Sequence, residues 1–186
     1  MANAIAKNAT LKVLYLHNNK ISNKGAKLLA DALKKNNTNV LRELYLLNNN
    51  ISDEGAKYVA DMLASNQTLQ EIELSSNNIG DDGAESIATS LSPAKNTSLH
   101  YIWLNNNKIS DQGAEKLVDA LESNHSIEVF GLSGNKIGKE VWGRIKAILS
   151  DPKRKEIEWI VWHHSLDLSH CPHRNQHLFL QSWQKR

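Results

Sequence analysis

The sequence has little cysteine, little net charge and no long apolar run, and each shortage excludes a class of protein. Cys171 is the only cysteine among 186 residues, which excludes an intramolecular disulfide framework and fits a reducing compartment. The 22 Lys and Arg residues nearly balance the 20 Asp and Glu residues, so no excess of positive charge favours nucleic acid or an anionic membrane. Apolar runs of the roughly 18 residues that a membrane span needs are absent, and the first residues do not resemble a signal peptide. We therefore expect a cytoplasmic protein that binds neither nucleic acid nor membranes.

One pattern recurs along the chain and determines the fold prediction. Its frame is L-x-x-L-x-L-x-x-N-x-I, with occasional replacement of one apolar residue by another. A further step of 30 residues predicts a sixth copy at Ile157, where the apolar positions match although Ser165 replaces the asparagine. A fixed period of this length indicates an array of stacked repeats. The copies alternate in spacing between 30 and 28 residues and begin at Leu11, Leu41, Leu69, Leu99 and Ile127.

Each repeat combines a short strand with a helix. Leucines at alternate positions, such as Leu14 and Leu16, have the period of a half-buried strand, so the residues between them point away from the core. In the second part of the repeat, residues 25–33, apolar residues recur at helical spacing. Serines precede three of the predicted helices at positions suited to N-caps, namely Ser22, Ser52 and Ser110.

The repeats must stack, because no single one can bury its apolar face. Strands of a parallel sheet lie about 4.8 Å apart, whereas packed helices need about 8–10 Å, so the helix side is wider and the array curves. We predict an α/β solenoid of horseshoe shape, with a parallel β-sheet on the concave side and α-helices on the convex side. An asparagine follows each strand, and its amide can bond the backbone of neighbouring turns. These are Asn19, Asn49, Asn77, Asn107 and Asn135.

A second asparagine recurs where each helix meets the next strand. Each copy lies in an Asn-x-Ser/Thr sequence, which is a glycosylation acceptor in proteins of the secretory pathway. The regular spacing instead indicates that the repeat itself requires this residue. The five positions are Asn8, Asn36, Asn66, Asn96 and Asn124.

The repeats resemble the ribonuclease-inhibitor-like class of leucine-rich repeats. That class has long α/β units and the signature N-x-I-x-x-x-G-A, whose Gly-Ala pair stands here at residues 25–26, 55–56, 83–84 and 113–114. The resemblance covers residues 11–149 well and residues 157–162 loosely. It implies a leucine-rich-repeat solenoid and a surface for protein–protein interaction instead of an active site.

The domain prediction follows the repeats. Residues 1–10 match the end of a helix from a preceding repeat, so the chain either belongs to a longer array or begins with a half-helix that covers the first edge. Residues 11–149 form five leucine-rich repeats, and residues 150–186 form a degenerate sixth strand with a C-terminal cap or tail. In the fifth repeat Trp142 replaces the small alanine, which should push that helix outward.

The outward strand positions carry the functional prediction, because the core does not constrain them. Tyrosine and tryptophan are enriched at interface hot spots, and three glutamates form an acidic patch beside them. A competing interpretation is that the aromatic rings only pack against each other across strands. The predicted residues that bind a protein partner of basic or amphipathic character are Tyr15, Tyr45, Glu43, Glu71, Glu73, Tyr101, Trp103 and Trp159.

Other chemistry is concentrated in the tail. His170, Cys171 and His173 offer metal ligands, but no second pair has zinc spacing, and no group is available to orient a cysteine nucleophile. We predict no catalytic residue, no metal site and no cofactor, and thus a non-enzymatic protein–protein interaction module. The alternatives left open are a leucine-rich-repeat segment of a larger receptor, a bacterial effector acting in the host cytosol, a small-GTPase activator, and a metal-binding or regulatory tail.

Overall fold

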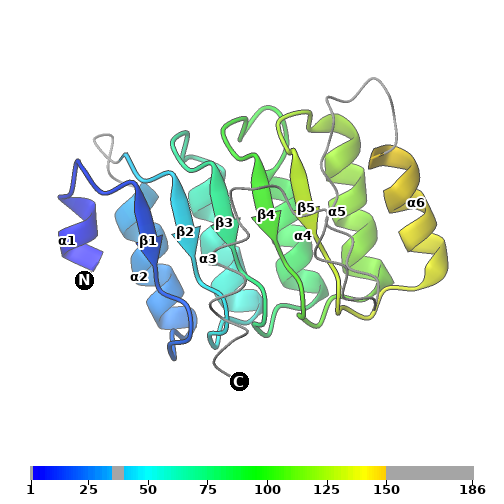
Figure 1. Cartoon of the computed structure of the whole chain (residues 1–186), viewed down its shortest axis with the longest axis horizontal. Coiled ribbons are helices and arrows are strands. Elements are labelled where there is room, and N and C mark those ends of the chain that lie inside the picture. Colours follow the sequence, from blue (N-terminus) through cyan, green and yellow to red (C-terminus); the bar gives the residue numbers. More distant parts are fainter. Residues whose placement is uncertain (1, 35–39, 150–186) are drawn as a thin grey trace, which may run out of the picture.

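The computed structural model describes residues 2–34 and 40–149, in which strands and helices alternate along the chain (Figure 1). The strands are β1 (Val13–Tyr15), β2 (Glu43–Tyr45), β3 (Glu71–Glu73), β4 (Tyr101–Trp103) and β5 (Val129–Gly131). The helices are α1 (Ala2–Ala6), α2 (Asn23–Lys34), α3 (Asp53–Leu63), α4 (Asp81–Ser90), α5 (Asp111–Ser123) and α6 (Lys139–Leu149). Trp159 and the predicted sixth strand lie outside these ranges.

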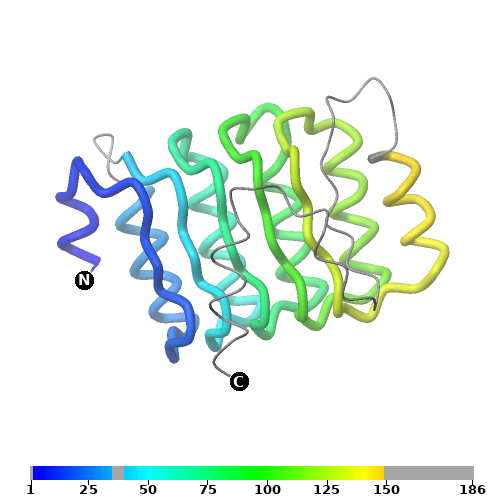
Figure 2. Tube along the Cα trace, in the orientation of Figure 1, coloured from blue at the N-terminus to red at the C-terminus, as the bar shows by residue number. Residues whose placement is uncertain are grey.

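The described strands form one parallel sheet in the order of the sequence. Each strand pairs with the next at the same repeat position, so that Glu43 lies opposite Glu71 and Tyr15 lies opposite Tyr45. Among the described residues, the long helices lie behind this sheet, and none of them covers its other face (Figures 1 and 2). This arrangement confirms the predicted α/β solenoid.

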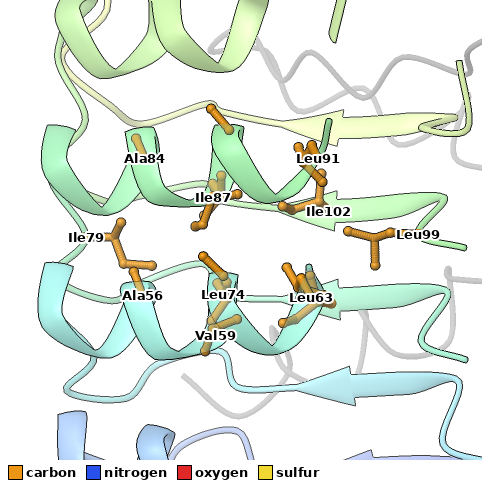
Figure 3. Packing of buried hydrophobic residues seen from close by; sticks show 14 of the residues in the cluster. Ala56, Val59, Leu63, Leu74, Ile79, Ala84, Ile87, Leu91, Leu99 and Ile102 are labelled. Carbon is orange, nitrogen blue, oxygen red and sulfur yellow. The ribbon is translucent and has the colours of Figure 1, made fainter. Parts of the chain in front are cut away.

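The core fills the layer between the sheet and the helices. Ile72 on β3 and Leu74, just after this strand, point inward and have no exposed surface, and neither do the helix residues Ile87 and Ala84. Figure 3 shows buried side chains of neighbouring repeats, among them Leu74, Ala84 and Ile87, lying next to one another. Burial of one such isoleucine contributes about 1.5–3 kcal/mol to stability. The helical spacing seen in the sequence therefore marks the residues that join one repeat to the next.

The asparagines that follow the strands form the predicted ladder. Asn107 accepts a hydrogen bond from the Ile79 amide at 3.0 Å and donates to the carbonyls of Leu74, at 3.0 Å, and Leu104, at 3.1 Å. One side chain thus bonds the backbone of two repeats. Asn49, Asn77 and Asn135 repeat this arrangement.

The second series of asparagines forms another ladder at the opposite ends of the strands. Asn96 accepts hydrogen bonds from the amides of Ser98 and Leu99 and donates to the Leu63 carbonyl of the preceding repeat at 2.7 Å. Its side chain is completely buried. Asn66 and Asn124 are equally engaged. Their Asn-x-Ser/Thr sequences therefore serve the repeat, as the spacing indicated.

The helix starts differ in part from the prediction. Ser110 caps α5 by accepting a hydrogen bond from the Gln112 amide, but Ser52 makes no such bond to α3. Most of the capping comes from the preceding repeat instead. The Asp81 carboxylate accepts hydrogen bonds from the amides of Ser110 and Gly113, so the first residue of α4 caps α5. Asp53 caps α4 in the same manner.

The two ends of the described array are less tightly packed than its middle. Leu14 on β1 and Leu16 just after it are partly exposed, whereas their counterparts in the second repeat, Leu44 and Leu46, are 1% and 0% exposed. At the other end α6 lies farther from α5 than the central helices lie from one another (Figure 1). This separation agrees with the expected effect of Trp142.

Candidate functional site: the outer face of the sheet

We call the side of the sheet turned away from the helices the sheet face. It comprises the first and third residues of each described strand and the residue two positions after the third. No Lys or Arg is present at these positions. They are Val13, Tyr15, His17, Glu43, Tyr45, Leu47, Glu71, Glu73, Ser75, Tyr101, Trp103, Asn105, Val129, Gly131 and Ser133.

A stacked pair of tyrosines occupies the β1 end of the sheet face. The rings of Tyr15 and Tyr45 are 4.8 Å apart between centroids and are inclined by 17°. They can stack because parallel pairing places the two residues side by side on adjacent strands. Tyr15 remains 47% exposed, and the His17 ring lies at 78° to its ring with 6.0 Å between the centroids. The outer surface of this stack is therefore open to solvent.

The Tyr45 hydroxyl connects the stack to the acidic residues. It donates a hydrogen bond to Glu43 Oε2 at 3.0 Å. Burial is the main cause that raises the pKa of Tyr45, and the nearby charges of Glu71 and Glu43 raise it further. The same causes, with burial first, raise the pKa of Tyr15. Both phenols are therefore neutral hydrogen-bond donors at physiological pH.

Trp103 lies flat on the sheet face instead of projecting from it. Its indole Nε1 donates to Glu71 Oε1 at 3.1 Å, across the β3–β4 boundary. On its other side, a Cβ atom added to Gly131 would lie 2.8 Å from the indole ring. Trp103 and Glu71 are each 9% exposed. The expectation that these two side chains are open to a partner is therefore wrong, because the ring lies over the space left by Gly131 and covers Glu71.

Three carboxylates lie together on β2 and β3. Glu43 and Glu71 are paired across the two strands, and Glu73 is the next outward residue on β3. Burial raises the pKa of Glu71 although Trp103 donates to it. Burial also raises the pKa of Glu73 to about 7, with a smaller contribution from the charge of Glu71, while hydrogen bonds from Ser75 act against this rise.

No cation neutralises this acidic patch within the described part of the chain. Lys12 and Arg42 precede β1 and β2, but the structure forms no ion pair between either of them and Glu43, Glu71 or Glu73. Like charges at paired positions of neighbouring strands destabilise a sheet. The patch therefore stores an electrostatic cost that a positively charged group would relieve.

Tyr101 points to a neighbour that the sequence analysis missed. Its hydroxyl donates to Glu128 Oε2 at 2.9 Å, and Glu128 Oε1 lies 3.5 Å from His100 Nδ1. Glu128 directly precedes β5, at a position that varies freely among the repeats, so no pattern marks it. The structure thus brings Tyr15, Tyr45 and the glutamates together and directs Tyr101 toward the β5 side, while Trp159 lies outside the described residues.

Residues 2–34 and 40–149 contain no group of three or more His, Cys, Asp or Glu side chains that could hold a metal ion. No helix in this part of the chain is both long enough and apolar enough to cross a membrane. The His and Cys residues of the tail, including Cys171, lie outside the described residues.

Comparison with known proteins places this repeat solenoid in a family. The family model described as leucine-rich repeat matches residues 7–30, 37–60, 65–88 and 95–118, which together exceed half of the chain. The chain belongs to the leucine-rich repeat family, as its resemblance predicted. No curated protein sequence matches it.

Solved structures share the fold at low sequence identity. The actin-binding site 2 domain of leiomodin-1 superposes with a TM-score of 0.69 at 18% identity, covering 100% of this chain and 95% of the other. The tropomodulin C-terminal domain of Caenorhabditis elegans gives 0.67 at 19% identity, with 80% and 88% covered. A leucine-rich-repeat protein of Leptospira interrogans gives 0.38 at 18% identity, covering 83% and 50%. The first two likenesses show a common solenoid fold.

Proposed function

We propose that this protein is a non-enzymatic binding module that recognises a protein partner through its sheet face. The observation that carries the proposal is the open stack of Tyr15 on Tyr45 beside Glu43. Among the described residues, Tyr15 and Leu28 are the large apolar or aromatic side chains that remain clearly exposed. Of these two, Tyr15 belongs to a cluster of aromatic and charged groups, which is the composition of an interface hot spot.

The rest of the sheet face supports the same role. The described strands are about 4.8 Å apart, so the face is roughly 20 Å wide, and loops and flanking residues extend it toward the roughly 800 Å² per partner of a standard interface. We propose the cytoplasm as the place of action, because the single cysteine suits a reducing compartment.

Differential affinity capture tests this proposal. The full chain serves as bait, and the double variant Tyr15→Ala/Tyr45→Ala is compared with the wild type by quantitative mass spectrometry. Tyr58→Ala on α3 is the control, because it removes a tyrosine from the helix side. We expect the double variant to lose a specific protein about tenfold or more, as hot-spot truncation does, while the control retains it. Equal capture by all three baits would rule out the sheet face as the interface.

Actin is the first defined partner to test, because the domain of leiomodin-1 that shares this fold is an actin-binding site. Co-sedimentation of the wild-type chain with filamentous actin gives a direct measurement. The same double variant and the same Tyr58→Ala control then show whether any binding uses the sheet face. Loss of sedimentation in the double variant alone would identify actin as the partner.

A further inference from the structure

The sheet face is negatively charged, whereas the chain as a whole carries a small positive charge. The complete chain has a formal net charge of +2 at pH 7. The sheet face carries three carboxylates, from Glu43, Glu71 and Glu73, and none of its described positions holds a Lys or Arg. A partner that binds here meets negative charge and aromatic surface together. Charge complementarity therefore requires a cationic group on the partner.

We infer that the partner inserts an arginine side chain, whose guanidinium stacks on the open surface of Tyr15 and pairs with the carboxylate of Glu43. This inference rests on the proposed function and names the chemistry of its partner. The Tyr15–Tyr45 stack provides a flat ring surface, and the hydrogen bond from the Tyr45 hydroxyl holds the Glu43 carboxylate next to it. The two groups are thus fixed relative to each other before a partner arrives.

The geometry favours arginine over lysine. A guanidinium is planar, stacks on aromatic rings and donates hydrogen bonds in a fork that matches a carboxylate, whereas an ammonium is a compact and strongly hydrated point charge. A ring beside a carboxylate uses both properties of the guanidinium at once. Glu71 lies on the next strand, and its carboxylate adds long-range attraction for a second basic residue of the same segment.

Binding of a cation would also relieve the repulsion within the acidic patch. Glu43 and Glu71 are paired on adjacent strands; burial raises the pKa of Glu71, and the charge of Glu43 raises it further. A guanidinium that stacks on Tyr15 and pairs with Glu43 adds a positive charge that offsets this repulsion. Unfavourable local features of this kind are expected where a sequence serves binding instead of stability.

Peptide titration tests the inference directly. The probe is a fluorescent hexapeptide of alternating arginine and glycine, compared with its lysine counterpart by anisotropy against the full chain at about 50 mM salt, where charge pairs are weakly screened. We expect the arginine peptide to bind about threefold to tenfold more tightly than the lysine peptide. Equal affinity of the two peptides, or no binding of either, would overturn the inference.

Two variants and two matched controls locate the site. Tyr15→Ala removes the stacking surface, and Glu43→Gln removes the charge but keeps an oxygen that accepts from Tyr45. We expect each to weaken arginine-peptide binding by about threefold or more, while Tyr58→Ala and Glu115→Gln on the helix side leave it unchanged. Unchanged binding in the first two variants would refute this placement. If the captured protein still depends on Tyr15 and Tyr45 while no arginine peptide binds, the inference fails and the proposed function stands.

Discussion

Replacement of Asn107 by alanine provides the strongest test of how the repeats hold together. The change removes an acceptor for the Ile79 amide and a donor to the carbonyls of Leu74 and Leu104. Ile79 is completely buried, so its amide is left without a partner away from water. An unpaired buried donor costs about 1–3 kcal/mol. The Leu74 and Leu104 carbonyls still accept from Asn77 and Asn135, so each loses one hydrogen bond of about 0.5–1.5 kcal/mol, and we expect a total loss of about 2–6 kcal/mol.

The matched control is Asn19→Ala, at the same position of the first repeat. Asn19 is exposed and donates to the carbonyls of Leu16 and His17 within its own turn. We expect it to cost less than about 1 kcal/mol, as replacements of exposed groups usually do. Equilibrium unfolding in urea, followed by circular dichroism, measures both variants. A difference below about 1 kcal/mol between them would refute the view that these amides join neighbouring repeats.

Three further predictions concern pH, packing and backbone space. The pKa of Glu73 is about 7 in the folded state and 4.5 in the unfolded chain, so the folded state binds its proton more tightly. The free energy of unfolding should therefore fall by as much as about 3 kcal/mol as pH rises between these values. Glu73→Gln should abolish this pH dependence of the urea midpoint. Ile72→Ala should lose about 2–5 kcal/mol in thermal or urea unfolding, whereas Leu28→Ala, at a side chain that is 59% exposed, should lose less than about 0.5 kcal/mol; equal losses would contradict the core assignment. Gly143→Ala should stabilise α6 by about 0.5–1 kcal/mol, because nothing lies within 4 Å of the added carbon, but Gly113→Ala should destabilise, because its added carbon would lie 2.5 Å from a carboxylate of the preceding repeat; a rise in melting temperature for both would show that this space is not restricted.

The repeat architecture was predictable from the sequence because its causes are local and periodic. Leu14 and Leu16 alternate within one strand, and asparagines such as Asn107 recur at a fixed distance from them. The same pattern therefore recurs in each repeat, so a wrong assignment in one repeat would conflict with the assignments in the others. The ladder of asparagine amides also followed from its spacing, since a polar group buried in every repeat needs a partner in the next one.

The capping of the helices was predicted only in part, because much of it crosses from one repeat to another. A serine before a helix suggests a local cap, and Ser110 acts in this way, but Ser52 does not. Asp81 instead bonds amides of the helix that begins 30 residues later. The aspartates do recur at repeat positions, so their periodicity held the signal that the local interpretation missed.

The sheet face was predictable as a set of positions but not as an arrangement of side chains. Alternation along each strand identifies which residues point outward, and it placed Tyr15 next to Tyr45 correctly. This alternation does not determine the orientation that a large ring adopts among its neighbours. Trp103 lies down because Gly131 leaves room and Glu71 accepts its indole hydrogen, and both conditions come from other strands.

The open first strand has a consequence for the order in which this molecule comes apart. Within the described sheet, β1 has a neighbour on one side, whereas β2, β3 and β4 have neighbours on both, so detaching β1 disrupts a single boundary. Amide hydrogens of β1 should accordingly exchange with solvent sooner than those of β3. Tyr15 belongs to β1, which detaches readily. A ligand that binds Tyr15 and Tyr45 together would therefore hold β1 against β2. Slower exchange at β1 would then report occupancy even before the ligand is identified.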